Sequence, residues 1–124
     1  MLSGKRIVLG VTGGIAAYRA AELISLLKKR GAEVRVVMTE HACRFIAPLT
    51  LETLTGNRVH TDLFAARDEI AHIALAKWAD LFVVAPATAN LIGKYAGGIA
   101  DDLLSTALLA APCPVLLALS LIHI

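Results

Sequence analysis

The chain has 124 residues, of which 57% are hydrophobic, 18% charged and 5% aromatic, and its formal net charge at pH 7 is +2. This length allows one domain with its own core, and the near-neutral charge, without interleaved basic and aromatic residues, argues against nucleic-acid binding. The two cysteines, Cys43 and Cys113, are too few and too far apart for a metal motif or a disulfide framework, so we expect no metal site and free thiols in a reducing cytoplasm.

Strands and helices alternate along the first half of the chain. Hydrophobic periodicity predicts a strand at 6–11, a helix at 15–30, a strand at 33–38, a short helix at 39–45 and a helix at 48–54. Basic residues 28–30 followed by Gly31 are typical of a helix C-terminus. Thr39 is an expected N-cap, and Pro48 is expected in the first turn of its helix.

The same alternation continues in the second half. We predict a short strand and a loop at 58–71, a helical or irregular segment at 72–78, a strand at 81–85, a helix from a turn at 87–90 to Tyr95, a helix from Asp101 or Asp102 to Ala110, and a strand at 114–118. Residues 103–124 carry no charged side chain and are long enough to cross a bilayer. Because Pro112 and Pro114 would break such a helix, we expect no membrane segment.

Apolar strands that alternate with helices predict an α/β fold. The expected architecture is a doubly wound parallel sheet in a Rossmann- or flavodoxin-like three-layer sandwich. Ligands of such sheets bind beyond the carboxyl ends of the strands. Residues 12–15, 38–39 and 86–90 follow three predicted strands, and they are therefore the candidate site.

The first of these loops, Gly10-Val11-Thr12-Gly13-Gly14-Ile15, is rich in glycine. Glycines allow a backbone to approach a ligand closely, and the start of a helix offers N–H groups to an anion, so a phosphate is the expected guest. The loop lacks the P-loop lysine and the G-x-G-x-x-G spacing, which argues against dinucleotide binding. A tight turn without a ligand explains the loop equally well.

Polar side chains also follow the strand at 81–85. The hydroxyl of Thr88 and the carboxamide of Asn90 could recognise a ribityl chain or the polar edge of a flavin. Thr88 is also explained as a simple helix cap. His72 precedes the same strand and could act as a general base, although a lone histidine is more often structural.

Together, these segments resemble a known family. The stretches are Gly10 to Tyr18, Met38-Thr39-Glu40, Phe45 to Thr50, His72-Ile73 with Lys77 to Asp80, Pro86 to Asn90, and Gly97 to Thr106. In this order they resemble the homo-oligomeric flavin-containing cysteine decarboxylases, over essentially residues 4–118. The similarity is greatest to members that decarboxylate phosphopantothenoylcysteine to phosphopantetheine in coenzyme A biosynthesis, some of them fused to a ligase domain.

The resemblance implies FMN as the cofactor. Gly13, Gly14 and Ile15 would line its site, with Thr39 and the loop Thr88-Ala89-Asn90 as further contacts, beside the hydroxyl of Thr12. His72 falls on the catalytic histidine of the family. In the implied reaction, the flavin takes a hydride from the β-carbon of the cysteine moiety, carbon dioxide leaves, and the reduced flavin returns the hydride. The resemblance further implies a homotrimer or homododecamer.

Two departures from the family pattern concern the end of the chain and one site position. Leu91 stands where many members have threonine. Residues 119–124 replace the Pro-x-Met-Asn motif and the later flap with a reactive cysteine, and they match a translated transposon end. We therefore expect a decarboxylase domain at 1–118, a non-native tail at 119–124, and a fragment that is inactive alone.

Two other functions share this scaffold. Flavin prenyltransferases of ubiquinone biosynthesis bind FMN on the same fold, but they tend to carry a Gly-Ala-Ser-Gly version of the first loop. Non-enzymatic flavin-binding regulators usually carry acidic extensions, and this sequence has none.

Overall fold

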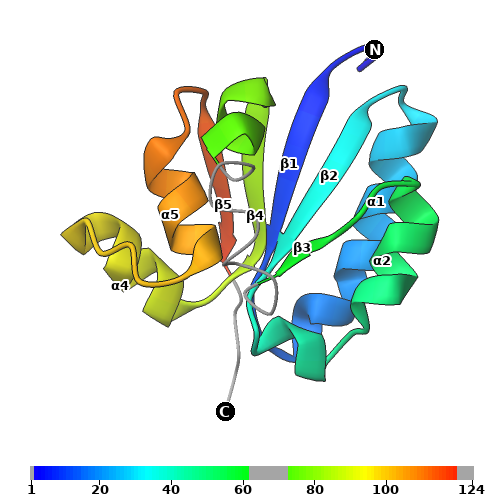
Figure 1. Ribbon diagram of the computed structural model, residues 1–124. Helices are drawn as coiled ribbons and strands as arrows, with labels where there is room; N and C mark the ends of the chain where they lie inside the picture. The colour runs from blue at the N-terminus through cyan, green and yellow to red at the C-terminus, as the bar shows by residue number, and fades with distance from the viewer. Residues whose placement is uncertain (1, 62–72, 120–124) are drawn as a thin grey trace.

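The computed structural model describes residues 2–61 and 73–119, which form a parallel sheet with helices on both faces (Figure 1). The strands are β1 (Arg6–Val11), β2 (Glu33–Met38), β3 (His60–Thr61), β4 (Leu81–Ala87) and β5 (Val115–Leu119). Their order is β3-β2-β1-β4-β5, and every neighbouring pair is parallel. The chain winds outward from β1 to β3 and then returns to the other side of β1 for β4 and β5. The predicted doubly wound fold is confirmed.

Helices cover the two faces of this sheet. They are η1 (Ile15–Tyr18), α1 (Arg19–Lys29), η2 (Ala42–Arg44), α2 (Pro48–Thr55), α4 (Ala89–Gly97) and α5 (Leu103–Ala110), and residues 73–78 are also helical. In Figure 1, α1 and α2 lie on one side of the sheet, and α4 and α5 lie on the other. Alternate strand residues face the two helical layers, which is why the strands are apolar along their whole length.

Two hydrophobic cores result from this layering. The first joins Leu9, Val36 and Met38 of the sheet to Ile24 of α1 and Leu51 of α2. The second packs other sheet residues, including Val8, Val37 and Phe82, against helical residues that include Leu75, Leu91 and Leu104. The first core includes Val11 at the end of β1 and the second includes Ala87 at the end of β4, so the loops beyond these ends start from fixed positions.

The helix ends follow the sequence signals. Asp102 and Ser105 form a capping box at the start of α5: the amide of Ser105 donates to Oδ1 of Asp102 at 2.8 Å, and the amide of Asp102 donates to Oγ of Ser105 at 3.1 Å. Gly56 and Gly98 end α2 and α4 with left-handed φ angles of 73° and 69°.

Strand β4 continues two residues beyond the predicted end at Ala85. Pro86 has no N–H to donate to a ladder, and the β4–β5 register shifts between Val84 and Ala87, an irregularity at which a proline is tolerated. The predicted helix at 15–30 begins as the 3-10 turn η1, and only its later part is α-helical. Within residues 2–61 and 73–119, no helix has both the length and the apolarity needed to cross a bilayer.

Candidate functional site

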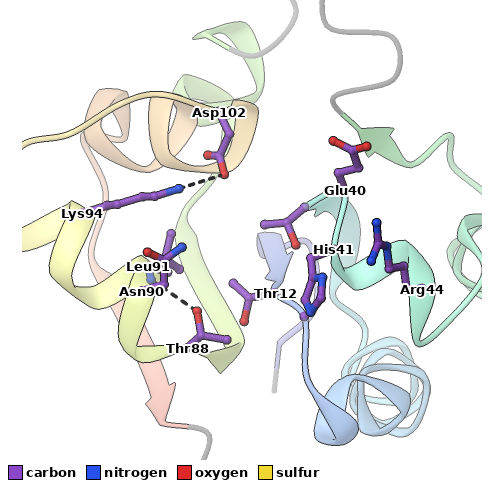
Figure 2. A pocket seen from close by; sticks show the side chains of 11 residues that line it. Thr12, Glu40, His41, Arg44, Thr88, Asn90, Leu91, Lys94 and Asp102 are labelled. Carbon is purple, nitrogen blue, oxygen red and sulfur yellow. Dashed lines mark hydrogen bonds and ion pairs between the residues drawn. The ribbon is translucent and has the colours of Figure 1, made fainter.

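A cavity of about 570 Å³ lies beyond the carboxyl ends of β1, β2 and β4 (Figure 2). The three loops predicted from the sequence meet here. Its lining consists of Thr12, Gly13, Thr39, Glu40, His41, Arg44, Thr88, Asn90, Leu91, Lys94 and Asp102. This is the point where the winding of the sheet reverses, between β1 and β4, and such switch points are where α/β sheets bind ligands.

Thr12 connects two of the loops. Its side chain is 2% exposed, and its hydroxyl donates to the carbonyl of Pro86 at the end of β4. Since the hydroxyl proton is already used, Thr12 can offer a ligand only the lone pairs of its oxygen. Its clearest role is to hold the β1 loop against the β4 loop.

Gly13 lies directly beneath the imidazole of His41. A Cβ atom placed on Gly13 would come within 2.0 Å of Cδ2 and 2.7 Å of Cγ of His41. The absence of a side chain therefore permits this contact, and the glycine has a packing reason as well as the ligand-binding reason inferred from the sequence. His41 also makes an edge-on contact with Phe45, with 5.4 Å between the ring centroids.

Thr39 and Thr88 occupy corresponding positions after β2 and β4. Oγ1 of Thr39 accepts a hydrogen bond from the amide of Ala42 at 3.1 Å, and Oγ1 of Thr88 accepts one from the amide of Leu91 at 3.3 Å. Thr88 is thus the N-cap of α4, Thr39 holds the first amide of η2, and both threonines still line the cavity. Helix capping and ligand contact, two alternatives for Thr88 at the level of sequence, are compatible.

An ion-pair cluster forms the wall of the cavity on the α4 side. Nζ of Lys94 lies 2.9 Å from Oδ1 of Asp101 and 3.7 Å from Oδ2 of Asp102. The hydrogen bond to Asp101, with the charge of Asp102 as a smaller contribution, raises the pKa of the Lys94 ammonium above its ordinary value. Lys94 therefore remains a cation that is already paired with carboxylates.

The candidate residues are only partly brought together. Thr12, Gly13, Thr39, Thr88 and Asn90 line the cavity, whereas Gly14 and Ala89 are not among its described lining residues. His72 lies outside the described residues, as do positions 120–124 of the expected tail, while Leu119 ends β5. Among the residues that the structure does describe, no three His, Cys, Asp or Glu side chains gather as a metal site.

Six lining residues were not named as site candidates from the sequence. On α4, Leu91 and Lys94 are one and four positions after Asn90, and the helical repeat places Asn90 and Lys94 on one face. That spacing was a usable signal. Glu40, His41 and Arg44 belong to a short turn whose direction depends on tertiary packing, and no periodicity marks it. Asp102 was foreseen as a cap, but its position at the cavity was not.

A doubly wound parallel sheet, with a polar cavity at its switch point and a glycine loop on one wall, defines an α/β protein of the kind that binds nucleotides and flavins. Comparison with known proteins makes this more specific. The family model described as Flavoprotein matches residues 1–121, and the chain belongs to this family.

Individual relatives agree with this assignment. The coenzyme A biosynthesis bifunctional protein CoaBC of Bacillus subtilis (strain 168) is 54% identical over 120 residues, which are 95% of this chain and 30% of that protein. The chain thus spans less than a third of the length of this relative. The crystal structure of the FMN-dependent cysteine decarboxylase TvaF from thioviridamide biosynthesis superposes with a TM-score of 0.91 at 28% identity, covering 96% of this chain and 75% of TvaF.

A third comparison includes a bound small molecule. A variant of PPC decarboxylase complexed with pantothenoylaminoethenethiol is 30% identical, with a TM-score of 0.77 over 96% of this chain and 68% of that protein. The sequence-based assignment to the flavin-containing cysteine decarboxylases is confirmed at the level of family.

Proposed function

We propose that this chain is the FMN-binding decarboxylase domain of an enzyme that converts 4′-phosphopantothenoylcysteine to 4′-phosphopantetheine in coenzyme A biosynthesis. The observation that carries the proposal is the meeting of the three strand-end loops around one polar cavity. The 54% identity to a CoaBC protein supports the particular pathway, and the likeness to FMN-dependent cysteine decarboxylases supports the cofactor and the reaction class.

The residues present fit a flavin mononucleotide. The cavity, at about 570 Å³, lies within the size range of cofactor sites. Gly13 presents backbone without a side chain at the cavity wall, and Thr39, Thr88 and Asn90 supply uncharged polar groups. When bound, FMN would supply the hydride acceptor that makes the loss of carbon dioxide possible.

The protein's own residues would hold the cofactor and assist the reaction. We assign Gly13, Gly14 and Ile15 to the phosphate end of the cofactor site, and Thr88, Ala89 and Asn90 to its polar ring edge. Thr12 holds these two loops together through Pro86. We assign to His72 the role of catalytic histidine, on the resemblance of its sequence context to the family.

The assembly is part of the same proposal. We infer a homotrimer or homododecamer in the cytoplasm, with a ligase domain in the parent protein. Tyr18, Phe45 and Leu49 are 50%, 43% and 69% exposed on η1, near η2 and on α2. Large apolar side chains that are exposed in this number support a subunit interface.

The test uses this chain fused in frame to the segment that follows the aligned region in the Bacillus subtilis relative. The fusion should be yellow after reconstitution with FMN, and it should release carbon dioxide from 4′-phosphopantothenoylcysteine. The variant His72→Asn should keep the yellow colour and lose turnover. A colourless fusion that cannot be reconstituted would refute the proposed function, and full activity of the variant would remove His72 from it.

A further inference from the structure

His41 is the cavity residue with the most specific geometry that the proposed function leaves without a role. Its imidazole lies over Gly13, and the ring also makes an edge-on contact with Phe45. His41 immediately precedes η2. Because the amide of Ala42, the first residue of η2, donates to Oγ1 of Thr39, the backbone at His41 is anchored next to the end of β2. These contacts fix the imidazole at the wall of the cavity, beside the glycine loop.

The charges around His41 favour an anion. Arg44, the last residue of η2, also lines the cavity, and Figure 2 shows its side chain on the same side of the cavity as His41. Of the two acidic residues in the lining, Asp102 is engaged by Lys94 at 3.7 Å on the opposite wall. The carboxylate of Glu40 points away from the imidazole in Figure 2. This wall of the cavity therefore combines a glycine loop, an imidazole and a guanidinium.

We propose that His41 is a phosphate-contacting residue that, with Arg44, makes the site select phosphorylated ligands. The inference rests on the proposed function and extends it to a position that the sequence did not single out. The shared chemistry is a phosphate monoester, carried both by FMN and by 4′-phosphopantothenoylcysteine. Because His41 lies against Gly13, in the predicted phosphate loop, FMN is favoured as the source of the phosphate. An imidazole N–H donated to a phosphate oxygen is a charge-assisted bond, stronger than one between neutral groups.

Binding measurements test this on the same fusion protein after removal of its flavin. Quenching of flavin fluorescence gives Kd for FMN and for riboflavin, which lacks the phosphate. We expect His41→Ala to weaken FMN binding by about tenfold or more and to change riboflavin binding by less than about twofold. His41→Gln, which retains an N–H donor, should recover part of the loss. Lys29→Ala removes an exposed cation from the end of α1 and should change neither value.

A second pair of ligands separates the two sources of phosphate. Binding of 4′-phosphopantothenoylcysteine and of its dephosphorylated form is measured on the FMN-loaded protein by calorimetry. A loss confined to FMN assigns His41 to the cofactor phosphate. A loss confined to the phosphorylated substrate assigns it to the substrate phosphate instead.

The packing of His41 on Gly13 is checked without any flavin. Gly13→Ala should lower Tm in the wild-type background. It should do so much less beside His41→Ala, which removes the two ring contacts and leaves only the 3.0 Å approach of Cβ. If the wild type binds FMN and His41→Ala changes the Kd of neither FMN nor 4′-phosphopantothenoylcysteine, the inference is wrong and the proposed function stands. A wild-type protein that binds no FMN contradicts both.

Discussion

Replacing Gly10 of β1 by alanine, the smallest possible enlargement of its side chain, should lower the stability of the fold. A Cβ atom at this position would lie 2.6 Å from Cδ1 and 3.3 Å from Cδ2 of Leu104, and 3.4 Å from the ring of Phe82. Carbon atoms in contact prefer about 3.5–4.0 Å, so the shortest of these approaches is too close by roughly 1 Å. Leu104 and Phe82 are both 0% exposed, and neither side chain can move aside into solvent.

The magnitude follows from two opposing effects. Overpacking a filled core lowers the free energy of unfolding by about 1–3 kcal/mol. Replacing glycine by alanine also lowers the entropy of the unfolded chain, which raises the free energy of unfolding by about 0.4–1 kcal/mol. We therefore expect Gly10→Ala to reduce the free energy of unfolding by about 1–2 kcal/mol. In a Leu104→Ala background the clashing δ carbons are gone, and the same change should be neutral or slightly stabilising.

Urea denaturation of the four proteins in this cycle, followed by circular dichroism, measures the coupling. Gly93→Ala is the matched control, since Gly93 is inside α4 with nothing within 4 Å of the new methyl group. That change should stabilise the protein by up to about 1 kcal/mol because alanine is the better helix former. Additive effects of Gly10→Ala and Leu104→Ala would refute the packing argument.

Three further predictions concern the walls of the cavity. Asp102→Ala should cost about 1 kcal/mol in urea denaturation because the cap of α5 is lost, while Asp102→Asn, which can still cap, should cost less. The pKa of Lys94 is raised in the folded protein, so its contribution to stability is complete below the unfolded value of about 10.5 and is lost as pH rises through the folded value. Lys94→Met should flatten this alkaline loss in Tm measured from pH 8 to 11. Thr88→Ala should weaken FMN binding and lower Tm by removing the cap of α4, whereas Thr88→Ser should retain both.

Elements with strong local signals could be predicted closely from the sequence. Strand β2 begins and ends at the predicted residues because its apolar run lies between charged or polar neighbours. The capping box of Asp102 and the glycine at the end of α2 are chemical signals of the same kind. The end of β4 was missed because proline usually stops a strand, and only its pairing with β5 shows that the ladder can absorb Pro86.

The site was predictable where strand ends alone decide position. Thr12, Thr39 and Thr88 follow parallel strands, and a parallel sheet necessarily gathers such residues at one edge. The contact of His41 with Gly13 was not predictable, because it depends on how the turn after β2 folds back over the β1 loop. The packing role of Gly10 was also hidden, since it involves a helix 94 positions later in the chain.

The most direct test of the account is a crystal structure of the FMN-reconstituted protein. We expect the phosphate to lie against the loop at 12–15 and beside His41, and the polar edge of the ring system to face residues 88–90. Density for the flavin at another part of the fold, with the switch-point cavity empty, would contradict the central claim.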